Sequence, residues 1–317
     1  MRVRRYGIRG PEVSELAFGA MSIRHDKQLS NGVSGSLLHA LDRGVNLIDT
    51  ARIYPESEKI IGRTLREWSG APPFISTKLS PLDREGFRFG GPLEKFYTPA
   101  GIADSVDSSL SALGVERLDI VHMHQWHYRW THELDWLDAL SDLRREGKVG
   151  LVAVSAQDHE HDALLEIVSQ GLVDGIQLIV NLFESRPCNA ILPRAAQKEV
   201  GVIARCVLDS GGLAAPLTDE EFRERPFLRH APGAEYRKRI AALNDEFGLD
   251  GSDSLVDLAL RFVVSDPAVS SITLGLTSSE QVDLACQAIG KGALSDHAVG
   301  LIRRKHVWTK NFYEKLL

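Results

Sequence analysis

Short apolar runs recur along this chain, and amphipathic helical patterns separate most of them. The runs are continuous rather than alternating in polarity, which is typical of strands buried on both faces of a parallel sheet. Alternation of strand and helix repeated eight times predicts an α/β fold of the (β/α)8 or TIM-barrel type, which takes about 250 residues. The predicted strands are Leu16–Phe18, Val45–Ile48, Phe74–Thr77, Leu118–His124, Leu151–Val154, Gly175–Val180, Val202–Arg205 and Ser271–Leu274.

A doubly wound sheet is the main alternative to a barrel. Its dinucleotide-binding signature, G-x-G-x-x-G after an early strand, does not occur in the sequence. No linker or low-complexity stretch divides the 317 residues, so we expect one domain over residues 1–317. Two long connections, residues 79–97 and 206–235, follow the third and seventh strands and leave the face where barrel active sites lie.

Composition excludes several classes of partner. A formal net charge of −6 does not supply the excess of positive charge that binds the phosphate backbone of nucleic acid. No apolar run is long enough to span a bilayer, and the basic start at residues 1–6 lacks the apolar stretch of a signal peptide. Cys188, Cys206 and Cys286 are too few and too scattered for a disulfide framework or a zinc site. We therefore expect a cytoplasmic protein with a small-molecule partner, no membrane partner and no metal; the sequence does not specify an oligomeric state.

Ionisable residues end three consecutive predicted strands. These residues are Asp49, Lys78 and His124, and Tyr54 follows five residues after Asp49. The carboxyl ends of neighbouring barrel strands share one rim, so we expect the four side chains to lie together. An ammonium group lowers the pKa of a nearby tyrosine, a carboxylate holds the lysine, and a histidine can donate a hydrogen bond to a carbonyl oxygen. Such a set supplies a proton but no hydride, which predicts a nicotinamide cofactor.

His122 lies two residues before His124, so both side chains share one face of the predicted strand. His122 is then expected either to point into the barrel below the site or to pack in its core.

Several segments resemble the aldo-keto reductase family. Asp49–Glu58, followed by Ile61 and Gly62, resembles the signature D-x-A-x-x-Y-G-x-S-E. Residues 147–155 resemble G-K-V-R-x-x-G-V-S-N, and Leu118–His124 resembles the strand that ends in the family's histidine. Residues 4–21 resemble the hairpin that caps the barrel and its first strand. The resemblance covers nearly the whole chain.

This resemblance implies an NAD(P)H-dependent carbonyl reductase or alcohol dehydrogenase. Tyr54 would donate the proton, Lys78 would lower its pKa, Asp49 would pair with Lys78, and His124 would orient the carbonyl. The basic residues of the 79–97 connection suit a polar or anionic substrate such as a sugar derivative, and we expect a small polar or sugar-like aldehyde or ketone. Two other functions are alternatives for a chain with this resemblance. One is a redox-neutral epimerase or isomerase that recycles its NADP, and the other is a non-catalytic nicotinamide-binding regulatory subunit.

The resemblance also implies a set of cofactor contacts. Ser155 and Gln177 match positions that hold the nicotinamide carboxamide. Arg205 replaces a ring-stacking tyrosine, and its alternative role is to pair with a carboxylate such as Asp209. Thr277 replaces the basic residue that holds the 2′-phosphate, yet the family favours NADP(H), with NAD(H) as the alternative. The implied contacts are Gly19, Met21, Asp49, Ser155, Gln177, Arg205, Cys206, Leu208, Gly275, Thr277, Ser278 and Gln281.

The segment after His124 is rich in aromatic residues and leaves the same rim. We expect Trp126 and His127, together with Phe87 from the 79–97 connection, to line the substrate pocket. Trp136 lies within a helical pattern and is expected to pack in the core.

Overall fold

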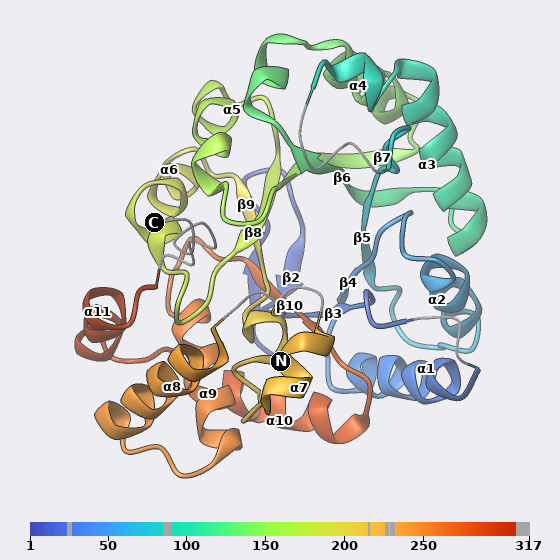
Figure 1. Ribbon diagram of the computed structural model, residues 1–317. Coiled ribbons are helices and arrows are strands. Elements are labelled where there is room, and N and C mark those ends of the chain that lie inside the picture. Colours follow the sequence, from blue (N-terminus) through green and yellow to red (C-terminus); the bar gives the residue numbers. More distant parts are fainter. Residues whose placement is uncertain (24–26, 85–90, 215, 226–227, 229–231, 309–317) are drawn as a thin grey trace.

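Eight parallel strands in the described part of the chain close into a barrel, which confirms the predicted fold (Figure 1). The computed structural model describes residues 1–23, 27–84, 91–214, 216–225, 228 and 232–308. Each barrel strand pairs with its sequence neighbours, and β10 closes the ring on β3. The strands are β3 (Leu16–Gly19), β4 (Leu47–Asp49), β5 (Phe74–Lys78), β6 (Leu118–Trp126), β7 (Val149–Ala156), β8 (Gly175–Ile179), β9 (Gly201–Arg205) and β10 (Ser271–Gly275).

Helices surround the barrel, and the sequence colours run around this ring in Figure 1. The main apolar core lies between the strands and these helices. Capping residues set the ends of α3: Thr98 accepts a hydrogen bond from the Gly101 amide, Pro99 follows it, and Gly114 ends the helix at φ +71°. The helices are α1 (Lys27–Asp42), α2 (Ser57–Leu65), α3 (Pro99–Leu113), α4 (Asp135–Arg145), α5 (Leu165–Gln170), α6 (Ile191–Gln197), α7 (Asp219–Glu224), α8 (Gly233–Phe247), α9 (Ser252–Val264), α10 (Ser279–Gly290) and α11 (Asp296–Lys305).

An antiparallel hairpin, β1 (Val3–Arg5) and β2 (Glu12–Ser14), precedes the barrel. Tyr6 in its turn is fully buried in a second, smaller core with residues such as Leu47 and Ile120. The Tyr6 ring lies against the first residues of β8 and β9, Gly175 and Gly201. A Cβ atom on Gly201 would lie 2.6 Å from the ring and one on Gly175 would lie 1.9 Å from the hydroxyl oxygen, so only glycine fits there. Tyr6 therefore plugs the amino-terminal end of the barrel.

Replacing Gly201 by alanine should destabilise the fold by about 1–3 kcal/mol, because the added methyl group overpacks the plug. The measurement is urea unfolding followed by circular dichroism. Gly35 in α1 is the matched control, since a Cβ atom on this residue would meet no neighbouring atom within 4 Å. Gly35→Ala should leave stability unchanged or raise it by about 0.5–1 kcal/mol. Equal effects of the two substitutions would contradict the plug.

Candidate active site

The strand register brings polar residues together at the carboxyl-terminal rim. Asp49 and Lys78 are the last residues of β4 and β5, and His124 lies near the end of β6. Lys78 pairs in register with His122, the residue two positions before His124. Tyr54 lies in the turn that follows β4, and its ring centroid is 6.0 Å from that of His124 in an edge-on arrangement. The four side chains expected to form one cluster therefore lie on one stretch of rim.

A buried ion pair joins Lys78 and Asp49. The ammonium group lies 2.8 and 2.9 Å from the two carboxylate oxygens and donates a third hydrogen bond to the Thr50 carbonyl at 2.8 Å. The two side chains are only 2% and 7% exposed. Burial lowers the pKa of Lys78, and the Asp49 carboxylate opposes this effect. All three ammonium protons thus have acceptors, and Lys78 is fixed in position.

Tyr54 lies beside this pair, with the Lys78 nitrogen 5.7 Å from its ring centroid. Burial raises the pKa of the Tyr54 phenol, Asp49 raises it further, and Arg205 lowers it. The net shift of the Tyr54 pKa is upward, with burial as its largest cause. Tyr54 therefore keeps its proton at neutral pH.

His124 is held in its neutral form. Burial lowers its pKa well below the ordinary value, and the positive charges of Lys78 and Arg205 lower it further. A neutral imidazole carries one N–H group, so the ring offers a hydrogen-bond donor without a net charge. Beside a protonated phenol, it completes a pair of donors suited to a carbonyl oxygen.

Ser155 and Gln177 are buried in β7 and β8. The Gln177 amide nitrogen donates to Asp49 Oδ1 at 3.0 Å. Its amide oxygen is buried and has no hydrogen-bond partner among the described residues. Such an acceptor is costly unless something donates to it. A carboxamide N–H group would satisfy it, so the residues present fit a nicotinamide.

Arg205 ends β9 and pairs with Asp158 at 2.7 Å, while also donating to the Ala156 carbonyl at 3.0 Å. Asp158 is therefore its carboxylate partner, whereas Asp209, the alternative considered from the sequence, accepts from the Tyr236 hydroxyl at 2.7 Å. These two hydrogen bonds hold the planar guanidinium group of Arg205 at one edge.

The segment after β9 has an unusual backbone. Cys206, Asp209 and Ser210 have φ angles of +53°, +48° and +57°, and Gly211 follows at +90°. Left-handed conformations cost free energy for residues other than glycine. Consecutive residues of this kind can also turn their amides toward one side and form an anion-binding concavity. Leu208, another implied contact, is partly buried in this segment.

The start of α10 holds the remaining implied contacts. Ser278 caps the helix by accepting from the Gln281 amide, and the Gln281 side chain accepts from the Thr277 amide at 2.8 Å. Gly275 pairs in register with Gly19, where β10 and β3 end side by side. Met21, just beyond Gly19, is 51% exposed.

Of the three residues predicted to line the substrate pocket, one is buried in the core, one stays a prediction and one lies outside the described residues. Trp126 is only 1% exposed and packs edge-on against Trp130 and Trp136, so the structure places it in the core instead of the pocket. The reason is that β6 extends to Trp126 and places its side chain against α4. His127 is partly exposed and stacks on Tyr128, with ring centroids 4.7 Å apart. Phe87 lies outside the described residues.

Comparison with known proteins agrees with this geometry. The model of the Aldo/keto reductase family matches residues 15–306. This chain belongs to the aldo/keto reductase family. It is 24% identical to an uncharacterized oxidoreductase of Bacillus subtilis over 307 residues, 94% of either chain.

Two solved structures share the fold of this aldo/keto reductase. An aldo-keto reductase from Bacillus halodurans in its holo form has a TM-score of 0.78 at 21% identity, covering 99% of this chain and 100% of that one. The glycerol dehydrogenase from Gluconobacter oxydans has a TM-score of 0.74 at 25% identity, covering 98% and 97%. The reductase is thus an oxidoreductase of a family that uses nicotinamide cofactors. None of its described helices is long and apolar enough to cross a membrane.

Sequence reasoning missed several residues that support the site of this reductase. Ser76, two positions before Lys78, donates to Asp49 Oδ1 at 3.0 Å. The two-residue spacing between Ser76 and Lys78 could have indicated this contact, because alternate residues of a strand share one face. Asp158 and Tyr236 come from distant loops or helices, and no local pattern indicates their partners.

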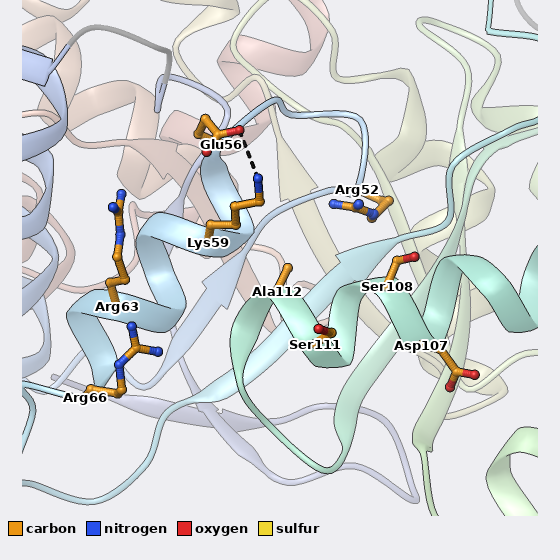
Figure 2. Close-up of a pocket in the computed structure, with 9 residues that line it drawn as sticks. All are labelled: Arg52, Glu56, Lys59, Arg63, Arg66, Asp107, Ser108, Ser111 and Ala112. Atoms are coloured by element: carbon orange, nitrogen blue, oxygen red, sulfur yellow. Dashed lines mark hydrogen bonds and ion pairs between the residues drawn. The ribbon is translucent and has the colours of Figure 1, made fainter.

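A groove of about 720 Å³ lies on the outer side of the reductase, between α2 and α3 (Figure 2). Two of its four cations are already paired with carboxylates, Arg52 with Glu58 and Lys59 with Glu56. Solvent screens much of the charge of groups at the surface, and we assign the groove no part in the active site. Its lining residues are Arg52, Glu56, Lys59, Arg63, Arg66, Asp107, Ser108, Ser111 and Ala112.

Asp49→Asn should destabilise the fold by about 3–5 kcal/mol, because it leaves the Lys78 ammonium buried without a counter-charge. Adding Lys78→Met should recover most of this loss, since the remaining pair is uncharged. Urea unfolding of the two single variants and the double variant measures both effects. If the losses in free energy of unfolding of the two single variants simply add in the double variant, Asp49 and Lys78 do not stabilise each other.

Proposed function

We propose that this reductase interconverts a carbonyl compound and its alcohol, with Tyr54 as the proton donor in the reducing direction. The observation that carries the proposal is the buried Lys78–Asp49 pair beside a protonated Tyr54, with neutral His124 facing the same phenol ring. The nicotinamide cofactor supplies the hydride. Residues 1–317 would form one catalytic domain.

Each side chain has a separate role in this proposal. Tyr54 transfers its phenolic proton to the carbonyl oxygen as negative charge develops there. His124 donates a hydrogen bond to the same oxygen and fixes its direction. Lys78 stabilises the tyrosinate that forms, because its ammonium is already fixed by Asp49 and needs no rearrangement.

The cofactor is held along the rim from β7 to α10. Ser155 and the unsatisfied Gln177 oxygen would hold the carboxamide, and the planar Arg205 guanidinium would suit contact with the aromatic ring. The backbone of residues 206–211 takes the diphosphate, and the start of α10 takes the adenosine end. We propose NADP(H) as the preferred cofactor, with NAD(H) as the alternative.

The substrate is a small polar or sugar-like aldehyde or ketone. Charged residues near the rim are paired with opposite charges: Lys95 with Asp83 at 3.1 Å, and Arg129 with Glu133 at 3.6 Å. Among the described residues these two pairs balance their own charges, and such paired polar groups suit a hydroxylated carbonyl compound. His127 at the same entrance offers a polar ring edge for a hydroxyl group.

Tyr54→Phe should abolish turnover of carbonyl substrates, with a loss of at least about 100-fold in kcat, because general acid catalysis contributes about this much or more. A panel of aldehydes, ketones and sugars, followed by nicotinamide absorbance, provides the measurement. Tyr6→Phe is the matched control at the opposite end of the barrel and should keep wild-type activity. Full activity of Tyr54→Phe would refute the proposal, and product formed without net absorbance change would instead indicate an isomerase.

NADPH should bind more tightly than NADH, as measured by quenching of protein fluorescence. Thr277→Arg should tighten NADPH about fivefold and leave NADH unchanged, because it adds a charge-assisted contact near the 2′-phosphate. Clearly tighter NADH in the wild type would overturn the NADP(H) preference. A Thr277→Arg variant that binds both cofactors as before would show that the adenosine end lies elsewhere.

A further inference from the structure

One oxygen of the Asp49 carboxylate accepts three hydrogen bonds. Lys78 donates to Oδ1 at 2.8 Å, and the Ser76 hydroxyl and the Gln177 amide each donate at 3.0 Å. The ion pair therefore depends on neutral donors as well as on its own charges. Of these donors, Ser76 lies on the same face of β5 as Lys78, two positions earlier.

The Ser76 hydroxyl has a second partner, His122 Nε2, at 3.1 Å. A hydroxyl carries one proton, and here that proton is directed to Asp49. The remaining contact then needs a donor on the histidine, which places the ring proton on Nε2. The series of donors runs from His122 to Ser76 and then to Asp49.

His122 is completely buried, below the rim on the interior face of β6. Burial lowers its pKa to about 3, with Lys78 lowering it as well and Asp49 opposing. The ring is therefore neutral at neutral pH, and it carries one N–H proton. The other charged or titratable groups near it are Lys78 on the neighbouring strand β5, Asp49 on β4 beyond it, and His124 on its own strand.

We propose that His122 is a positioning residue. Its Nε2–H group donates to the Ser76 oxygen, so that the Ser76 hydroxyl donates to Asp49 and holds the carboxylate against Lys78. This inference rests on the proposed function for its kinetic consequences. Without the donor from His122, the Ser76 hydroxyl can turn away from Asp49. The carboxylate then holds Lys78 less firmly, and burial lowers the pKa of Lys78 further.

The kinetic test is a double-mutant cycle on the full-length protein. His122→Leu and Ser76→Ala should each lower kcat about five- to tenfold, which lies within the range that a typical single hydrogen bond contributes. Each should move the alkaline limb of the kcat–pH profile to lower pH by about half a unit. The double variant should be no worse than either single variant, because both act through one hydroxyl.

Two further variants separate positioning from structural damage. His122→Gln keeps an N–H donor at the end of its side chain, so it should recover kcat to within about threefold of the wild type. Ser271→Ala removes another buried barrel hydroxyl, which donates to the Ser14 carbonyl, and should leave the pH profile unchanged. Losses that multiply in the double variant, or no recovery with His122→Gln, would overturn the proposal.

A spectroscopic test does not depend on activity. In long-range ¹H–¹⁵N spectra, the His122 ring, assigned by comparison with His122→Gln, should be the neutral Nε2–H tautomer from pH 5 to 8. A neutral Nδ1–H tautomer would overturn the proposal, since Nε2 would then need the Ser76 proton. If no carbonyl substrate is ever turned over but the Nε2–H tautomer is found, the proposed function fails while the donor arrangement stands.

Discussion

The ion pair between Lys78 and Asp49 governs the arrangement of the whole rim. Two opposite charges inside a protein are tolerated only when their remaining hydrogen-bonding capacity is also satisfied. Here the Thr50 carbonyl, the Ser76 hydroxyl and the Gln177 amide complete the pair. These groups come from strands β4, β5 and β8 or the turns that follow them, so the pair requires a closed barrel. Burial at this point also raises the pKa of Tyr54 and keeps its phenol protonated at neutral pH.

Much of the fold could be predicted from the sequence because parallel barrel strands leave a simple pattern. Continuous apolar runs located the eight barrel strands, and polar residues at their ends indicated the rim. Capping residues and glycines act locally, as at Thr98 and Gly114, so they can be recognised without a structure. Family resemblance then gave the residues around Tyr54 their roles.

Other features depend on contacts between distant segments. Trp126 lies in an aromatic-rich segment of the kind that lines pockets. Strand β6, however, extends to this residue and pairs with β7, which places its ring in an aromatic cluster with Trp136. Arg205 had several carboxylates within plausible reach, and only the fold selects Asp158. The direction of the Tyr54 pKa shift depends on burial and charge balance in three dimensions, which no motif encodes. Short-range patterns therefore identify the reactive groups better than they identify what tunes them.

The closure of the barrel has a consequence for how the chain is made. The first barrel strand, β3, pairs with the last, β10, and the hairpin residue Tyr6 packs against the starts of β8 and β9. Contacts between such distant segments form slowly, because a long loop must close before they contribute. During synthesis, one edge of β3 stays without its partner until nearly the whole chain has emerged from the ribosome. The strand β3 is thus made before its partner β10, and an unpaired strand edge of this kind is open to wrong pairing until β10 is in place.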